Sequence, residues 1–290
     1  MTRLVRLIMP VVLLVVLWQV ADGSVAAGRI ARAEPFWLTL ALAAVLAQTV
    51  LSALRWRLTA GALGLDLPAG RAVSEYFVAQ LVNQTLPGGV LGDAARAVRS
   101  QDIAGLRTAA EAVVLERLAG QIAMFAWLAL ALTWSLIFGH IAWPQGTALA
   151  FMALVGAAIG AIWLARRARY AAVLATARAG LFAPDVRFAQ VALAAAILAL
   201  NLAGFACAAR ATGSTLSPEA VLTLIPLILT AMLIPFGIGG WGWREGAAAA
   251  LFPLAGLAPA AGLAASATFG ATILLAALPG VVLLGRSRRP

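Results

Sequence analysis

Long apolar runs, separated by short charged segments, constrain this chain more than any other feature of its sequence. The 290 residues are 63% hydrophobic and 11% charged, whereas a soluble domain averages about 45–50% apolar and about 25% charged residues. A helix needs about 20 apolar residues to cross the roughly 30 Å hydrocarbon layer of a membrane. The pattern therefore predicts an all-α polytopic membrane protein, and it excludes an ordinary soluble enzyme and a disordered chain.

Six of the apolar runs are long, with few polar interruptions, and are predicted to cross the membrane completely. They are Leu4–Ala21, Phe36–Leu54, Ala112–Phe138, Thr147–Ala165, Phe188–Ala209 and about Ala258–Leu284. The first run is longer than the apolar part of a usual signal peptide, so we expect it to be retained as a helix. The second run is followed by Arg55-Trp56-Arg57, which we interpret as an interfacial tryptophan between two anchoring charges.

Two further apolar regions, Val73–Leu91 and Leu216–Leu257, are interrupted by polar residues, proline and glycine. Arginine, which accounts for all 21 basic residues, indicates how these regions lie. If both cross the membrane, 11 arginines fall outside and 9 inside, although basic residues tend to remain cytoplasmic. If both enter and return to the same side, 16 arginines lie inside and 3 outside. We therefore predict about six full transmembrane helices, two re-entrant helical hairpins and two cytoplasmic termini.

With this topology, the two halves of the chain have the same order of elements in opposite orientations. This is an inverted-topology repeat within a single integral-membrane domain, residues 1–290, with halves at 1–139 and 140–290. Such repeats place broken helices and a substrate site near the middle of the bilayer. The hairpin tips therefore mark the candidate site. The alternative interpretation is that proline and glycine kink two ordinary spans.

Each hairpin tip combines helix-breaking residues with polar side chains. The first tip contains Pro87, Gly88, Gly89 and Gly92, together with Asn83, Asp93 and Arg96. The second contains Pro235, Gly239, Gly240 and Gly242, together with Trp241, Trp243, Arg244 and Glu245. Asp93 is placed to cap the helix that follows, and the free amides at a helix start would suit a phosphate. The alternatives are a simple ion pair between Asp93 and Arg96, and tryptophans that pack or anchor rather than line a ligand path.

Charges at membrane depth form the third motif. Glu116 and Arg117 lie in the long apolar run that ends at Phe138. A charged side chain at the bilayer centre costs roughly 2.5–3.5 kcal/mol on insertion scales, so such residues usually face a cavity, pair with one another or bind a substrate. The alternative interpretation is an ion pair that pins this helix to the first hairpin.

The remaining composition narrows the chemistry. One cysteine, Cys207, and one histidine, His140, exclude an internal disulfide and a multi-histidine metal site. We interpret them as a small core residue and an interfacial residue. The net charge of +10 fits cytoplasmic loops and anionic lipid head groups better than nucleic acid. We predict no metal, no cofactor and no nucleic-acid partner.

The three motifs, in this order and at this spacing, resemble the lysylphosphatidylglycerol synthase transmembrane family, also called the flippase-like family. The residues that carry the resemblance are Asn83, Leu86-Pro87-Gly88-Gly89, Gly92-Asp93, Arg96, Glu116-Arg117, Gly120, Pro235, Gly239-Gly240-Trp241-Gly242 and Arg244-Glu245-Gly246. The early Arg55-Trp56 is similar too. The resemblance implies translocation of a lipid between leaflets, aminoacylated phosphatidylglycerol in the full-length members. Those members also carry a soluble aminoacyltransferase domain. We expect this chain to be a short form without that domain and therefore without synthesis.

We therefore expect a bacterial inner-membrane lipid transporter, and not an enzyme. Its ligand would be a phosphate-bearing lipid of the anionic, aminoacylated or polyprenyl-phosphate kind. Arg96, Arg117 and Arg244 would bind the phosphate, while Asp93, Glu116 and Glu245 would hold these arginines in the empty site. The alternatives are a membrane enzyme acting on a polyprenyl-phosphate lipid and a non-transporting adaptor of a lipid or glycolipid pathway. The sequence leaves open a homo-oligomer and a lipid-modifying enzyme as partner.

Overall fold

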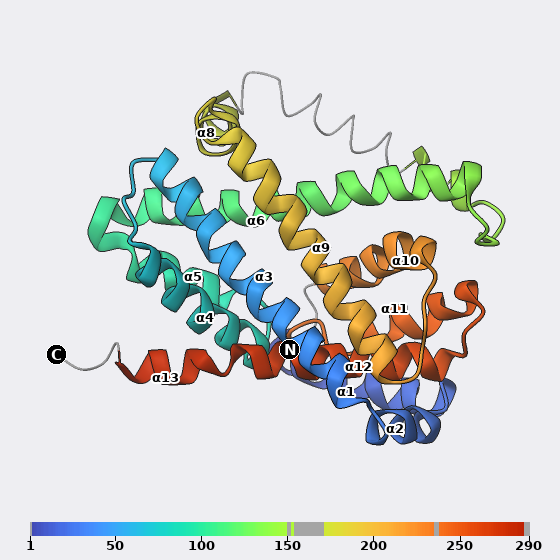
Figure 1. Ribbon diagram of the computed structural model, residues 1–290. Coiled ribbons are helices and arrows are strands. Elements are labelled where there is room, and N and C mark those ends of the chain that lie inside the picture. The colour runs from blue at the N-terminus through green and yellow to red at the C-terminus, as the bar shows by residue number, and fades with distance from the viewer. Residues whose placement is uncertain (1, 150–151, 154–170, 235–237, 287–290) are drawn as a thin grey trace.

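The computed structural model describes residues 2–149, 152–153, 171–234 and 238–286, and these residues form helices joined by turns (Figure 1). The first half contains α1 (Thr2–Val20), α2 (Gly23–Ala31), α3 (Pro35–Ala62), α4 (Ala69–Thr85), α5 (Leu91–Arg99) and α6 (Gln101–Phe138). The second half contains α8 (Ala171–Phe182), α9 (Arg187–Ala211), α10 (Pro218–Thr230), the 3-10 helix η2 (Ala231–Leu233), α11 (Trp243–Leu251), the 3-10 helix η3 (Phe252–Ala255), α12 (Pro259–Ala277) and α13 (Pro279–Arg286). The predicted all-α class is confirmed.

Four segments are long and apolar enough to cross a membrane. They are α3, α6, α9 and the stretch Pro259–Gly285, which runs through α12 into α13. Each coincides with a predicted span. A fifth crossing results if α1 and α2 are taken together, although they meet at an angle of 95°. Most of the predicted span Thr147–Ala165 lies outside the described residues, so the total of six stays a prediction.

Both interrupted regions contain a turn between two helices, as the glycine and proline content indicates. In the first, α4 ends at Thr85 and the chain turns before α5. Gly88 and Gly89 have φ angles of 99° and 63°, a left-handed conformation that side-chain-bearing residues rarely adopt. In the second, the turn between η2 and α11 includes Gly239 and Gly240, which also have positive φ. Pro235 lies outside the described residues.

The two turns meet, although their sequences are about half the chain apart. Pro87 and Ile238 form an isolated antiparallel backbone bridge. The start of α5 and the start of α11 therefore both lie near this bridge, which we call the junction of the two turns. The return of each region to its own side of the membrane, and the inverted repeat, stay predictions.

Small residues hold the helices close enough to position this junction. Helices α3 and α9 run side by side through the molecule, with α6 crossing near one end and α12 near the other (Figure 1). Lipid tails are as apolar as leucine, so helices in a membrane associate through tight packing at small residues. Accordingly, a Cβ atom added to Gly204 of α9 would lie only 3.3 Å from Phe269 of α12. Phe269 also packs on Phe205, with ring centroids 5.2 Å apart.

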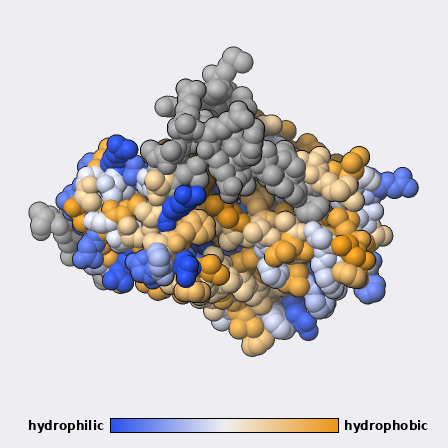
Figure 2. Space-filling model, turned by 90° about the horizontal axis from the view of Figure 1, so that it is seen from above, coloured by the Kyte–Doolittle hydropathy of each residue, from blue (hydrophilic) through white to orange (hydrophobic). Residues whose placement is uncertain are grey.

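The outer surface is largely apolar. Figure 2 shows broad hydrophobic areas broken by separate hydrophilic side chains. Large apolar side chains such as Val11, Leu130, Ile137 and Val191 are more than half exposed. Such exposure would be costly in water and is expected where a helix faces lipid.

Candidate functional site

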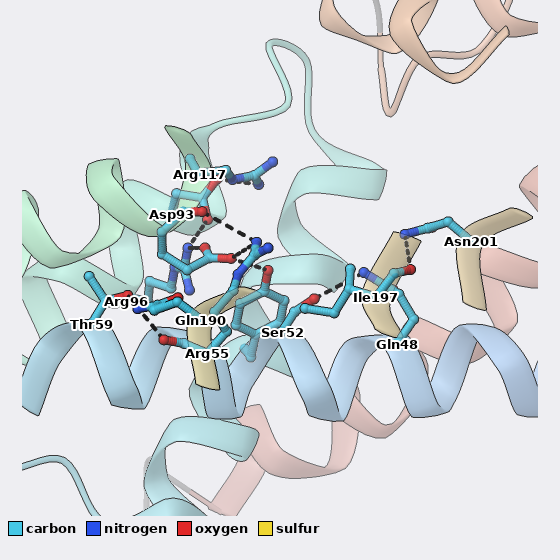
Figure 3. A network of polar contacts seen from close by, with 12 residues as sticks. Gln48, Ser52, Arg55, Thr59, Asp93, Arg96, Arg117, Gln190, Ile197 and Asn201 are labelled. Atoms are coloured by element: carbon cyan, nitrogen blue, oxygen red, sulfur yellow. Dashed lines mark hydrogen bonds and ion pairs between the residues drawn. The ribbon is translucent and has the colours of Figure 1, made fainter. Parts of the chain in front are cut away.

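Figure 3 shows Arg55, Arg96, Asp93 and Arg117 close together in one polar network. They belong to a buried ionic cluster built from four helices, with Glu116 of α6 at its centre. The Oε1 atom of Glu116 is 2.7 Å from Nη2 of Arg55 in α3, and its Oε2 atom is 2.9 Å from Nη2 of Arg96 in α5. Tyr76 of α4 donates its hydroxyl to Oε1 at 3.4 Å. A buried charge is tolerated only when it is paired and hydrogen-bonded. One carboxylate therefore compensates two guanidinium groups and ties α3, α4, α5 and α6 together.

Two aromatic rings enclose Arg96, which is completely buried. Its guanidinium carbon lies 4.7 Å from the ring centroid of Trp56 and 4.6 Å from that of Tyr76. Stacking on aromatic faces stabilises a guanidinium that has lost its water. This arrangement corrects the interpretation of Arg55 and Trp56 as an interfacial anchor, since they are only 4% and 1% exposed. Both side chains face inward, where Arg55 pairs with Glu116 and Trp56 stacks on Arg96.

Asp93 extends the cluster from the first turn of α5. Its Oδ1 atom is 3.0 Å from Nη2 of Arg96, and its Oδ2 atom forms an ion pair with Arg117 and accepts from Nδ2 of Asn83 at 3.2 Å. Asn83 in turn accepts from the backbone N–H of Gly92 at 2.7 Å. The prediction that Asp93 caps α5 is therefore wrong: Asn83, from α4, satisfies an N–H at the start of α5, and Asp93 is free to pair with arginines.

Arg244 and Glu245 form a second buried cluster at the start of α11. Nη2 of Arg244 lies 2.6 Å from Oε1 of Glu245, and Nε of Arg244 donates to Oγ of Ser266 at 3.0 Å. The other carboxylate oxygen accepts from the backbone N–H of Gly242 at 2.6 Å. Trp241 covers the pair, with its ring centroid 5.2 Å from the guanidinium carbon. Both charged side chains are completely buried, so each compensates the other.

We expect the free energy of unfolding of the double variant Arg244→Met with Glu245→Gln to lie within about 1–2 kcal/mol of that of the parent protein, because both buried charges are removed together. Glutamine keeps an oxygen that can accept from Gly242. Arg244→Met alone leaves a buried carboxylate without its partner and should lower the free energy of unfolding by about 3–5 kcal/mol. Thermal unfolding of the purified proteins in detergent measures both. A double variant as unstable as the single one would contradict this compensation.

Arg117 is the most exposed charged group of the first cluster, and several cavities reach it. A polar cavity of about 210 Å³ between α3, α6, α9 and α10 is lined by Arg117 together with Gln121, Asn201, Gln48 and Ser52. The side chain of Arg117 is 46% exposed, whereas those of Arg96 and Glu116 are at most 1% exposed. Its guanidinium can therefore meet a ligand while it is still paired with Asp93.

Two more cavities lined by described residues include Arg117. One, of about 180 Å³, extends from Arg117 past Asp93 and Asn83. The other, of about 590 Å³, reaches from Arg117 along Gly88 and Gly89 to the facing Gly240 of the second turn. Arg117, the exposed arginine of the cluster, thus faces a cavity that reaches the place where the two turns meet.

An apolar groove adjoins the polar cavity. It has a volume of about 610 Å³ and lies between α6, α9 and the start of α10, with Ile122, Trp127 and Val191 among its lining residues. Ala123, Ala194 and Leu198 line both the groove and the polar cavity. A ligand with a polar end and a long apolar chain could therefore occupy the two spaces at once.

The structure brings together five of the seven predicted binding residues: Asn83, Asp93, Arg96, Glu116 and Arg117. The ion pairs that the sequence offered as purely structural alternatives are present as well. Asp93 pairs with Arg96, and Glu116 and Arg117 of α6 pair with residues of the first hairpin. Arg244 and Glu245 lie in their separate cluster. Phe269 and Met232, which contact Arg244, line the cavity beyond Asp93. Trp241 packs on Arg244, Trp243 is half-buried, and neither is among the lining residues named for these cavities.

Sequence reasoning missed four residues of these clusters, namely Arg55, Trp56, Tyr76 and Ser266. A signal was present in two glycines that let an arginine approach closely. A Cβ atom added to Gly120 would lie 2.9 Å from Nη2 of Arg55, and one added to Gly270 would lie 2.1 Å from Nη2 of Arg244. Glycine in an apolar helix can therefore mark the place where a buried guanidinium passes.

The fold and the site define a multi-pass helical membrane protein with two broken helical regions that meet beside a charged cavity. The family model of the lysylphosphatidylglycerol synthase transmembrane region matches residues 4–280. The chain belongs to this family, which confirms the resemblance. The comparisons with curated proteins and with solved structures find no match.

Proposed function

We propose that this protein moves a phosphate-bearing lipid between the two leaflets of the membrane. One observation carries the proposal: the polar cavity at Arg117 lies next to the apolar groove between α6 and α9, with which it shares lining residues. A lipid has the same two-part character, with a charged head group and long chains. Membership in a family named for the synthesis of a phospholipid supports a lipid as the ligand.

Arg117 is the residue that would bind the phosphate. A guanidinium can donate two parallel hydrogen bonds to phosphate oxygens, which makes arginine well suited to this contact. In the empty site Arg117 pairs with Asp93. When a head group enters, Arg117 exchanges partners, and Asp93 keeps Arg96 at 3.0 Å and Asn83 at 3.2 Å. The exchange leaves no carboxylate of the cluster unpaired.

We propose transport rather than catalysis because neither carboxylate of the cluster is free. Glu116 is held by Arg55 and Arg96, and Asp93 by Arg96, Arg117 and Asn83. A general base needs a carboxylate within reach of the proton that it removes. We further propose a bacterial inner membrane as the location, with both termini in the cytoplasm, on the strength of the arginine distribution.

A bulky side chain at the boundary that the cavity and the groove share tests the proposal. Ala123 lines both spaces, so Ala123→Trp should slow lipid movement about tenfold or more, which corresponds to at least about 1.4 kcal/mol of barrier. Ala126 lies three residues further along α6, is exposed and is not among the lining residues of the groove or the cavity. Ala126→Trp is therefore the matched control and should transport like the parent protein.

The assay uses proteoliposomes that contain fluorescent phosphatidylglycerol, whose outer-leaflet fraction is bleached by dithionite. Faster bleaching of the inner-leaflet lipid than in empty liposomes supports transport. Release of inorganic phosphate from an added polyprenyl phosphate would favour the enzyme alternative. If the protein neither moves nor cleaves any lipid of an anionic, aminoacylated and polyprenyl-phosphate panel, the adaptor alternative replaces the proposal.

A further inference from the structure

The charges of the first cluster do not balance. Among the described residues it contains three guanidinium groups, Arg55, Arg96 and Arg117, and two carboxylates, Asp93 and Glu116. The cluster therefore has one surplus positive charge at neutral pH. An unbalanced charge in a poorly hydrated site favours a ligand of the opposite sign.

The surplus lies at the ligand side of the cluster. The two oxygens of Glu116 are committed to Arg55 and Arg96. The carboxylate of Asp93 is shared by Arg96, Arg117 and the amide of Asn83. Arg117 therefore shares the carboxylate of Asp93 with two other groups. It lines all three cavities, whereas Arg55, whose charge is paired with Glu116, lines only the polar cavity.

Apart from Arg117 and the ion pair of Arg55 with Glu116, the polar side chains that line the polar cavity are neutral. Gln48, Ser52, Gln121 and Asn201 provide amide and hydroxyl groups, which can bind the hydroxyls of a glycerol or sugar head group. The carboxylates that line the three cavities, among the described residues, are Glu116 and Asp93, and both are already paired with arginine. An ammonium group in this space would have no free carboxylate and would lie near a surplus arginine.

We propose that the site selects lipids whose phosphate-bearing head group has a net negative charge and neutral hydroxyl substituents, and that it discriminates against aminoacylated head groups. The inference rests on the proposed function and names its substrate class. The chemistry that the site recognises is a phosphate ester, whether the ester belongs to a lipid or to a soluble molecule. The apolar groove next to the cavity assigns it to a lipid.

Competitive lipid retention tests the selection without requiring transport. The purified protein in detergent is mixed with equal amounts of phosphatidylglycerol, lysylphosphatidylglycerol and phosphatidylcholine, and the bound lipids are counted by native mass spectrometry. We expect retention of phosphatidylglycerol over lysylphosphatidylglycerol by about tenfold or more, the range for hydrogen bonds to a charged group. Arg117→Gln should reduce this ratio about tenfold, because it removes the surplus charge.

Arg107→Gln is the matched control. Arg107 also lies on α6 and pairs with a carboxylate, Glu111, at 3.0 Å, but its side chain is 90% exposed. This variant should keep the parent's ratio. Equal or stronger retention of lysylphosphatidylglycerol by the parent protein would overturn the proposal, as would an unchanged ratio in Arg117→Gln.

One further outcome distinguishes a lipid from a soluble molecule as the source of the phosphate, and another distinguishes failure of the transport function from failure of the selection. Binding of sn-glycerol 3-phosphate more tightly than phosphatidylglycerol would assign the site to a soluble phosphate ester and overturn the lipid class. Preferential retention of phosphatidylglycerol, without movement of the fluorescent lipid in proteoliposomes, would support the selection proposed here and overturn only the transport function.

Discussion

The variant Glu116→Gln is expected to lose about 3–5 kcal/mol of its free energy of unfolding, which is a large part of the total for a typical protein. The carboxylate lies 2.7 Å from Arg55 and 2.9 Å from Arg96. A neutral amide of the same shape leaves both guanidiniums buried, and Asp93 is then the remaining carboxylate in the described part of this cluster. Thermal unfolding in detergent, followed by tryptophan fluorescence, measures the loss.

Glu111→Gln provides the control on the same helix. Glu111 pairs with Arg107 at the surface, and exposed pairs of this kind contribute about 0.3–0.5 kcal/mol. Adding Arg55→Gln to Glu116→Gln should recover part of the lost stability, because one uncompensated charge is removed. If Glu116→Gln is as stable as Glu111→Gln, the carboxylate does not compensate the two arginines.

The variant Arg117→Gln is expected to move lipid about ten to a hundred times more slowly than the parent while it keeps nearly the same stability. The loss of rate follows from the removal of charged hydrogen bonds to phosphate, which contribute about 1.5–3 kcal/mol. The stability is kept because Asp93 retains Arg96 and Asn83 as partners. The fluorescent-lipid assay in proteoliposomes and thermal unfolding in detergent measure the two quantities.

Arg117→Lys distinguishes phosphate recognition from simple charge balance. Lysine keeps the charge but not the planar fork of donors, so we expect an intermediate rate. A lysine variant that matches the parent would mean that only the charge matters at this position. Transport by Arg117→Gln at the parent rate would remove Arg117 from the ligand path altogether.

The spanning helices and the turns could be predicted because they depend on local sequence. A run such as Phe188–Ala209 is largely apolar, with no charged residue, and becomes α9 (Arg187–Ala211). Gly88 and Gly89 are needed wherever the chain takes a left-handed turn. Signals of this kind lie within a few residues of the structure that they determine.

The partners of the charged residues could not be predicted, because they come from distant parts of the chain. Arg55 precedes Glu116 by 61 positions, and its interpretation as an interfacial anchor followed from its place at the end of an apolar run. The cap of α5 is assigned to the wrong residue for a similar reason. Asn83, in the preceding helix, accepts from the N–H of Gly92. The sequence favours Asp93 as the cap only because Asp93 lies nearer to the start of α5. Motif spacing identified Asp93, Arg96, Glu116 and Arg117 of the first cluster, but neither Arg55 nor the separation of Arg244 from that cluster.

The bridge between Pro87 and Ile238 joins the two halves of the protein through main-chain atoms, and this has a consequence for how the protein can evolve. Such a link does not depend on which side chains the two residues carry, so most single substitutions leave it in place. A change in chain length does not, since one inserted or deleted residue between Thr85 and Val90 would shift the register of the two segments. We therefore expect an insertion or a deletion in either tip to disturb this contact more than most single substitutions outside the positive-φ glycines.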